Sequence, residues 1–309
     1  MHTDAVGHIP VLLDQVVELL SPAPGETVLD CTLGRGGHAA ALMPRIPGGA
    51  YVGIDVDPAN AEFARKRLEP IAAEHGVELV VVADNFARVV DAAEHPSLVG
   101  GVDMLLADLG FASNQMDDPA RGLAFSHDGP LDMRLAGPAP GDGDGDAASL
   151  VNTLPETALA DLIYRYGEER LSRRIARKIV ERRSESPIKT TKELADICRR
   201  AYPPPRAKGG RGIHPATRTF QALRIAVNGE LQALSTLLER LPQLLKPRGR
   251  AAVIAFHSLE DRPVKESFLK MQQDGLAQRL TRKPITAGPE ETTRNPRSRS
   301  AKLRGLRRT

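Results

Sequence analysis

Glu26-Thr-Val-Leu-Asp-Cys-Thr-Leu-Gly-Arg-Gly-Gly-His38 is the stretch that decides the fold of this 309-residue chain. It reads as an apolar strand that ends in the acid Asp30, followed by a glycine-rich turn that opens a helix near Gly37. Gly34 and Gly36 let the backbone turn and approach a ligand closely, and the free N–H groups of the following helix can bind polar oxygens. The stretch therefore predicts a site for a nucleotide-like cofactor.

Short apolar runs alternate with helical periodicity on both sides of this stretch. We expect further strands at 51–54, 78–82 and 102–106, with helices at 58–73 and 86–93 between them. Such alternation predicts a parallel sheet with helices on both faces, and a ligand site beyond the carboxyl ends of its strands. Those ends carry the acids Asp30, Asp55, Asp84 and Asp108.

Beyond residue 110 helical periodicity replaces the alternation, and no convincing strand returns until 251–256. We therefore expect an inserted all-α domain at 111–214 that recognises the substrate. Residues 1–110 and 215–309 would together form one Rossmann-like domain. The expected fold class is α/β with a helical insertion.

Charge divides the chain more sharply than its net value of +3 suggests. Residues 1–160 carry 8 Lys/Arg and 24 Asp/Glu, which leaves 34 Lys/Arg and 15 Asp/Glu for residues 161–309. The run 197–229 has no acid and holds seven cations. This asymmetry favours a polyanionic partner. Because aromatic residues make up only 4% of the chain, a nucleic acid would be held mostly by charge.

The two cysteines provide neither a zinc-binding spacing nor a disulfide framework, which fits a reducing cytosol. No basic leader begins the sequence, and no apolar run approaches the roughly 18 residues of a membrane span. We therefore expect a cytoplasmic protein with no membrane anchor and no bound metal.

The sequence of the glycine turn alone is compatible with two different kinds of cofactor. Read as Gly34-x-Gly36-x-x-Ala39, it matches the dinucleotide fingerprint, and Asp55 lies 21 residues after Gly34, where an acid that binds ribose is expected. In that fingerprint the first glycine comes at the strand end, whereas Asp30 ends the strand here. An acid at this point offers an anion to a cofactor with a cationic amino group. The stretch also resembles the methyltransferase pattern Asp-x-Gly-x-Gly-x-Gly, with Thr32 in place of the first glycine.

Several further blocks stand in a fixed order along the chain. Together they are similar to the bacterial 16S ribosomal RNA cytosine-N4 methyltransferase family, also called MraW or RsmH, over essentially the whole length. The blocks are Gly34-Arg-Gly-Gly-His38, Asp108-Leu-Gly with Gln115-x-Asp-Asp118, Arg121-Gly122, Asp128-Gly-Pro-Leu-Asp-Met-Arg134, Tyr166-Gly-Glu-Glu169, His214-Pro-Ala-Thr-Arg-Thr-Phe-Gln-Ala-Leu-Arg224, Phe256-His-Ser-Leu-Glu-Asp-Arg262 and Asn295-Pro-Arg-Ser-Arg-Ser300.

The resemblance implies a class I Rossmann-like sheet, S-adenosylmethionine as methyl donor, and 16S rRNA of the small ribosomal subunit as substrate. The implied target is cytosine 1402 of the decoding region. One departure is Phe111-Ala-Ser-Asn114, where relatives commonly show Val-Ser-Ser-Pro, so that Ala112 has no hydroxyl. Matching by motif implies a cofactor site of Gly36, Gly37, His38, Asp55, Phe86, Asp108 and Gln115.

The exocyclic amine of cytosine is a poor nucleophile because its lone pair is conjugated into the ring. An enzyme must orient it and accept its proton. Our hypothesis is that Asp108, or a backbone carbonyl beside it, accepts a hydrogen bond from the amine. His257 and Ser258, at the end of the next strand, would face the base, although His257 fits a structural role equally well.

Four residues that border the insertion are our candidates for contacts with RNA phosphates. Arg224 has an alternative role, because in the middle of a helix it can pair with an acid. The four candidates are Arg211, His214, Arg218 and Arg224.

Two rival functions stay open. The glycine spacing and Asp55 would suit a nicotinamide-dependent oxidoreductase. A non-catalytic RNA-binding or ribosome-assembly protein with a retained cofactor pocket is the second rival, against which the intact Asp55, Asp108 and Phe256-His-Ser258 argue.

Overall fold

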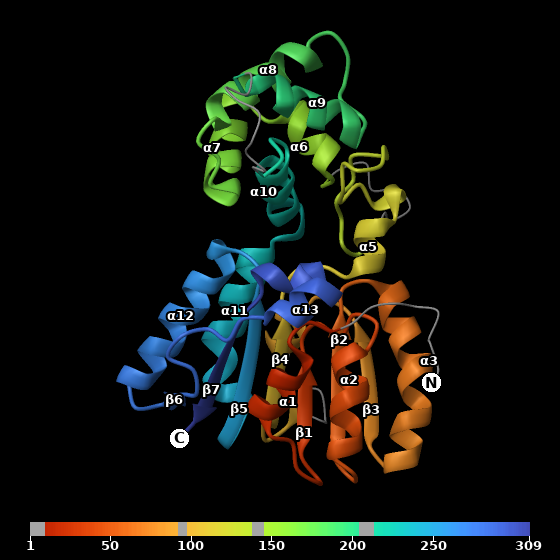
Figure 1. Ribbon diagram of the computed structural model, residues 1–309, viewed down its shortest axis with the longest axis vertical. Helices are drawn as coiled ribbons and strands as arrows, with labels where there is room; N and C mark the ends of the chain where they lie inside the picture. The colour runs from red at the N-terminus through yellow and green to blue at the C-terminus, as the bar shows by residue number, and fades with distance from the viewer. Residues whose placement is uncertain (1–9, 92–97, 138–144, 204–212) are drawn as a thin grey trace. The chain divides into compact units, whose positions relative to one another are not determined.

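The computed structural model describes residues 10–91, 98–137, 145–203 and 213–309. It divides into two compact units (Figure 1). Met1–Gly110 and Leu231–Thr309 form one, called the sheet unit below, and Phe111–Glu230 forms the other, called the helical unit.

A seven-stranded sheet forms the centre of the sheet unit, in the order β3-β2-β1-β4-β5-β7-β6. Strands are parallel from β3 across to β5, and β7 runs antiparallel to both β5 and β6. This confirms the expected α/β class with a largely parallel sheet. The strands are β1 (Thr27–Asp30), β2 (Ala50–Asp55), β3 (Glu78–Ala83), β4 (Val102–Asp108), β5 (Leu245–Ala255), β6 (Ala277–Arg279) and β7 (Lys302–Arg308).

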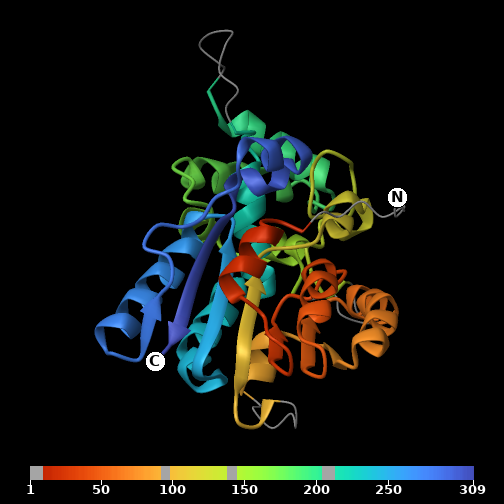
Figure 2. The same cartoon turned by 60° about the horizontal axis from the view of Figure 1, so that its bottom comes forward.

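Helices cover both faces of this sheet (Figures 1 and 2). Consecutive strand residues point to opposite faces, so Val28 packs in a cluster with α1, α2 and α3, whereas Leu29 packs in a cluster with α11 and α12. The helical segments are α1 (Leu13–Leu20), α2 (Gly37–Leu42), η1 (Met43–Arg45), α3 (Pro58–His75), α4 (Phe86–Asp91), α11 (Glu230–Leu244, starting at the boundary residue), α12 (Ser258–Gln273), α13 (Pro289–Arg294) and η4 (Pro296–Ser300).

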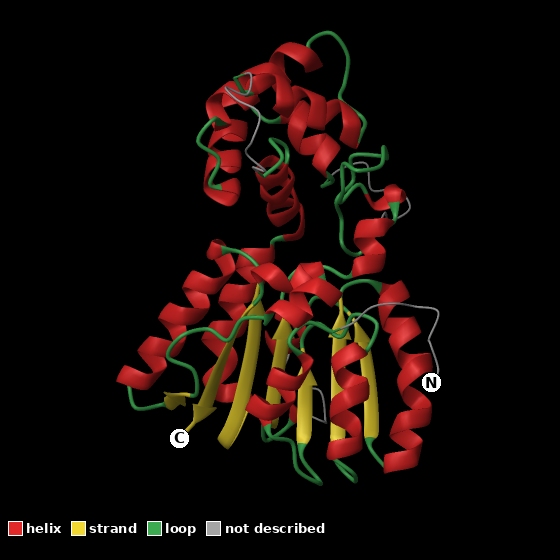
Figure 3. Ribbon diagram, in the orientation of Figure 1, coloured by secondary structure: helices red, strands yellow, loops and turns green. Residues whose placement is uncertain are grey.

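The described residues of the helical unit form helices joined by loops (Figure 3). Buried Ile163, Ile175 and Leu194 come from three of them and contribute to its apolar interior. Among the described residues, no helix of the chain is both long and apolar enough to cross a membrane. The segments are α5 (Ser113–Asp117), η3 (Pro119–Arg121), α6 (Ala147–Thr153), α7 (Glu156–Gly167), α8 (Ser172–Arg183), α9 (Thr191–Ala201) and α10 (Thr217–Asn228).

The boundary of the helical unit differs from the one expected. We ended the insertion at residue 214 and gave the next helix to the Rossmann-like domain, but α10 packs against α7 inside the helical unit. The two helices approach so closely that a Cβ on Gly167 would stand 2.5 Å from the carbonyl oxygen of Arg218. The apolar face of α10 packs against other helices rather than against the sheet. Sequence periodicity shows that a helix has an apolar face but not which element that face packs against.

Candidate functional site

Two of the acids predicted at the strand ends, Asp30 and Asp108, lie where the order of the sheet reverses, between β1 and β4, whereas Asp84 follows the edge strand β3 and pairs with Arg88. Asp30 pairs in register with Leu106, so that Asp108 continues past the end of β1. The backbone N–H of Asp108 donates to Oγ1 of Thr32 at 2.6 Å and ties the two strand ends together. In open α/β sheets, ligands bind at such a reversal.

Asp30 lies behind the glycine turn and is only 1% exposed. Its Oδ2 accepts a hydrogen bond from the Tyr51 hydroxyl at 2.8 Å, and its Oδ1 accepts one from the N–H of Thr32 at 3.0 Å. Burial raises the pKa of Asp30 to about 6, although the Tyr51 bond opposes that rise. The expectation that Asp30 offers its anion to a cofactor is wrong, because both oxygens are buried against the chain itself.

The turn has the left-handed backbone that its glycines permit, with φ of 55° at Gly34 and 76° at Gly36. The N–H of Gly34 donates to Oδ2 of Asp55 at 2.7 Å, and the N–H of Asp57 donates to Oδ1 at 2.8 Å. Burial raises the pKa of Asp55 to about 6. Each carboxylate oxygen has a second lone pair, so Asp55 can still accept a bond from a ligand hydroxyl.

Gly37 follows this turn and starts α2. A Cβ at Gly37 would stand 2.6 Å from the Pro10 side chain. A larger residue would push away the N-terminal segment that crosses the turn, so Gly37 has a packing role as well as the predicted role in cofactor binding.

Asp108 and His38 face each other beside this turn. Oδ2 of Asp108 lies 3.9 Å from Nδ1 of His38, while Nε2 of His38 bonds to the carbonyl oxygen of Val11 at 3.0 Å. A carbonyl oxygen only accepts hydrogen bonds, so Nε2 carries a proton, and Nδ1 is the ring nitrogen that faces Asp108.

The other oxygen of this carboxyl, Oδ1 of Asp108, is buried and has no hydrogen-bond partner within the described part of the chain. Burial raises the pKa of Asp108 well above its ordinary value, and the charges of Asp30 and Glu260 raise it further. A buried acceptor without a partner is costly. The site therefore fits a ligand that donates a hydrogen bond to Oδ1.

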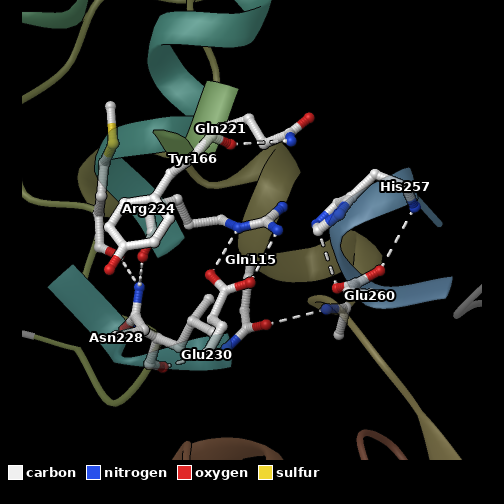
Figure 4. A network of polar contacts seen from close by, with 11 residues as sticks. Gln115, Tyr166, Gln221, Arg224, Asn228, Glu230, His257 and Glu260 are labelled. Carbon is white, nitrogen blue, oxygen red and sulfur yellow. Dashed lines mark hydrogen bonds and ion pairs between the residues drawn. The ribbon is translucent and has the colours of Figure 1, made fainter. Parts of the chain in front are cut away.

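His257 and Ser258 lie where β5 ends and α12 begins, and Figure 4 shows His257 beside Glu260. Oε2 of Glu260 accepts a hydrogen bond from the N–H of Phe256 at 2.8 Å, and Oε1 lies 3.2 Å from Nε2 of His257. Our sequence analysis did not select Glu260, which is 3% exposed, accepts a bond from the turn and lies beside the imidazole. Its position three residues after His257, at the start of a helix, is a capping pattern that identifies it.

The remaining two residues of the predicted cofactor site lie in different units. Phe86 starts α4 after β3 and packs, partly buried, against the core of the sheet unit. Gln115 is 3% exposed in the helical unit, where its Oε1 accepts a bond from the N–H of Ala112 at 2.9 Å and its Nε2 donates to the carbonyl of Leu135 at 3.1 Å. Gln115 therefore forms one half of a capping box at the start of α5, and a hydroxyl at position 112 would form the other half.

The predicted RNA contacts differ in their surroundings. Arg211 lies outside the described residues. His214 is exposed and stacks on Phe125 with 4.5 Å between ring centroids. The exposed guanidinium of Arg218 donates to the carbonyl oxygen of Glu168 at 3.3 Å.

Arg224 forms a fork with Glu230 instead of facing solvent (Figure 4). Its Nε and Nη2 donate to the two carboxylate oxygens at 2.7 and 2.8 Å, and the side chains are 12% and 13% exposed. The guanidinium carbon also lies 4.7 Å from the centroid of the Phe111 ring. In this structure Arg224 therefore has the alternative role, pairing with an acid, rather than the role of a phosphate contact.

Comparison with known proteins shows the family of this chain. Residues 5–309 match the model of the MraW methylase family. The chain is 48% identical over 301 residues to the "Ribosomal RNA small subunit methyltransferase H" of Acidobacterium capsulatum, covering 96% of this chain and 97% of that protein. It is 49% identical over 304 residues to the protein of the same name from Synechococcus sp. (strain CC9902), covering 97% of each. A third relative with this name, from Deinococcus deserti, is 46% identical over 302 residues, or 97% of this chain and 93% of the relative. The chain therefore belongs to the MraW methylase family.

Proposed function

We propose that this chain transfers a methyl group from S-adenosylmethionine to the N4 amine of cytosine 1402 in 16S ribosomal RNA of the small subunit. Family membership and the names of the relatives support methyl transfer to small-subunit rRNA. The observation that carries the proposal is Oδ1 of Asp108, a buried acceptor without a partner among the described residues, at the reversal of the sheet. An amine N–H is the donor it lacks.

The residues at the strand ends suit S-adenosylmethionine. The turn at Gly36, Gly37 and His38 lets a ligand approach, Asp55 accepts bonds from ribose hydroxyls, and Phe86 packs beside adenine. Bound there, the cofactor supplies an electrophilic methyl group on a sulfonium.

Asp108 prepares the nucleophile. When an amine N–H donates to Oδ1, the nitrogen is held with its lone pair directed at the methyl group, and positioning of this kind supplies on the order of 7 to 11 kcal/mol of a barrier. His257 and Ser258 face the base from the next strand end. Glu260 holds the His257 ring in place.

His38 gives the amine proton a place to go. A carboxyl whose pKa is raised as far as that of Asp108 is readily protonated, and a protonated carboxyl cannot accept a second proton. The lone pair on Nδ1 of His38, held toward Asp108 by the bond from Nε2 to Val11, takes the proton and leaves the carboxylate ionised. The titratable groups around this pair are Asp30 and Glu260, with His257 beyond Glu260.

The pH dependence of turnover tests this proton path. In His38→Asn the amine proton has only Asp108 to go to, so half-maximal kcat should move to a higher pH than in the wild type. His75→Gln, on α3 in the same unit, should leave the profile unchanged. If the His38→Asn profile matches the wild-type profile after scaling, His38 takes no part in the proton path.

The overall function is tested with S-adenosylmethionine labelled in its methyl group and purified small subunits. We expect label in 16S rRNA, and we expect thermal stabilisation by S-adenosylmethionine but not by NAD. A ligand at 100 times its Kd adds about 2.7 kcal/mol to the free energy of unfolding. Stabilisation by NAD would favour an oxidoreductase, and stabilisation by S-adenosylmethionine without transfer would favour a non-catalytic RNA-binding protein.

A further inference from the structure

Helix α8 separates apolar and basic side chains on opposite faces. Ser172, Ile175, Ala176 and Ile179 are buried, at the i, i+3, i+4, i+7 spacing of one helical face. Arg173, Arg174 and Arg177 are each exposed and stand two positions before a buried residue, which corresponds to about 200° around the helix, and exposed Arg170 lies just before α8 begins. These arginines, called the α8 basic face, are Arg170, Arg173, Arg174 and Arg177.

The α8 basic face is not neutralised within the unit. No described residue forms an ion pair or hydrogen bond with the side chains of Arg170, Arg173 or Arg174. Arg177 reaches Glu156 only at 3.8 Å, with both side chains well exposed, at 67% and 43%. Such an exposed pair contributes little and is screened by salt. Three of the four guanidinium groups therefore keep their full bonding capacity for a partner.

Arg218 extends this face from a second helix. Its guanidinium donates to the carbonyl oxygen of Glu168, two residues before Arg170. The start of α10 thus lies next to the residues that precede α8. Between Arg170 and Glu181 the chain carries no acid, so this stretch of sequence has an excess of positive charge.

We propose that the α8 basic face, with Arg218 beside it, docks the phosphodiester backbone of the ribosomal RNA substrate. The inference rests on the function proposed above and names a surface that it leaves unassigned. Guanidinium groups match phosphate oxygens in geometry and charge. From Arg173 to Arg177 the face is about 6 Å long, and Arg170, just before the helix, extends it, so that it offers contacts to more than one phosphate. Contacts of this kind position RNA without reading its sequence.

The test replaces all four arginines of the α8 basic face by alanine and measures binding to small subunits as a function of salt. Each phosphate contact contributes about 0.7 to 0.9 to the slope of log K against log salt. We expect the slope to fall by about three units and the Kd at 0.15 M salt to rise at least tenfold. A second variant with four lysines keeps the charge, so its slope should stay close to that of the wild type.

A matched control removes four exposed lysines of the sheet unit, Lys66, Lys265, Lys270 and Lys283. Its slope should change by less than one unit. An unchanged slope in the four-alanine variant overturns the proposal, as does an equal loss in the control. If the four-alanine variant binds RNA normally but loses affinity for vesicles of anionic lipid, the partner of this face is a membrane and the proposal is equally wrong.

Binding of S-adenosylmethionine and methyl transfer at saturating subunit concentration separate this inference from the function itself. The four-alanine variant should bind the cofactor as the wild type does and should raise KM much more than it lowers kcat. If the wild-type protein transfers no methyl group, the proposed function fails, while the salt slopes still decide whether the face binds RNA.

Discussion

The two units of this chain place their charged side chains in opposite ways. At the strand ends of the sheet unit, acids are withdrawn from water and bonded to the chain itself, as Asp30 is to Tyr51. On α8 of the helical unit, Arg173 and Arg174 are exposed and have no partner among the described residues. Buried charges act through geometry and shifted pKa values, whereas exposed ones act through a field that salt weakens. The sheet unit is therefore suited to chemistry and the helical unit to holding a polyanion.

The largest expected effect comes from Asp108→Asn. The amide can still orient the amine but cannot accept its proton, so kcat should fall by about a thousandfold, within the range of 10²–10⁴ for a lost general base. The Kd of S-adenosylmethionine should change by less than about tenfold. Single-turnover methyl transfer and calorimetry measure the two separately. A variant that loses only cofactor affinity would show that Asp108 is not catalytic.

The Arg224–Glu230 pair is one of the ion pairs in the helical unit whose charges are mostly buried, as is Arg134–Asp132. Arg224→Ala leaves Glu230 without its partner and should lower the free energy of unfolding by about 3 kcal/mol. Urea unfolding measures the change. Arg199→Ala, which breaks an exposed pair with Asp196 in the same unit, should cost about 0.5 kcal/mol or less. Equal effects in the two variants would contradict the contrast between buried and exposed charge.

Asp55→Asn should raise the Kd of S-adenosylmethionine about tenfold, because ribose hydroxyls bond more strongly to a carboxylate than to an amide. The pKa of Asp55 is raised to about 6, so wild-type affinity should fall as the pH drops through 6 and the carboxylate is protonated. The Asn variant should lack this dependence. Calorimetry between pH 5 and 8 measures the Kd of S-adenosylmethionine for both proteins. If the Kd of the wild type and of the Asn variant changed with pH in the same way, a contact between Asp55 and the ribose would be excluded.

Asp30→Asn should have the smallest effect, seen in stability alone. The folded-state pKa of Asp30 is about 6, above its ordinary value of 3.8, so the folded protein binds this proton more tightly than the unfolded chain. The contribution of protonated Asp30 to the free energy of unfolding is then complete at low pH and is lost as the pH rises through 6. The Tm of the variant relative to the wild type should therefore be higher at pH 7 than at pH 4. The opposite trend would show that ionised Asp30 stabilises the fold.

The sheet and the glycine turn could be predicted because strand periodicity and positive-φ glycines are local properties. The role of Asp30 could not, because it depends on which group lies opposite in three dimensions. Glu260 stands in a capping pattern that our sequence analysis did not use, and pairing with an acid was one of two roles that the sequence left open for Arg224. Tyr51 comes 21 residues after Asp30, and its hydroxyl occupies the oxygen that we had assigned to a cofactor. Likewise, the sequence of α10 has the same apolar periodicity whether the helix packs against a sheet or against α7, so the sequence could not assign α10 to a unit.

The most direct test of the central claim is to map the methyl group. Small subunits incubated with the protein and labelled S-adenosylmethionine are digested with nuclease, and the nucleosides and RNA fragments are identified by mass spectrometry. We predict N4-methylcytidine in the fragment that contains cytosine 1402, and none with Asp108→Asn. A methyl group on another nucleotide, on a ring carbon or on a ribose would contradict the proposed reaction.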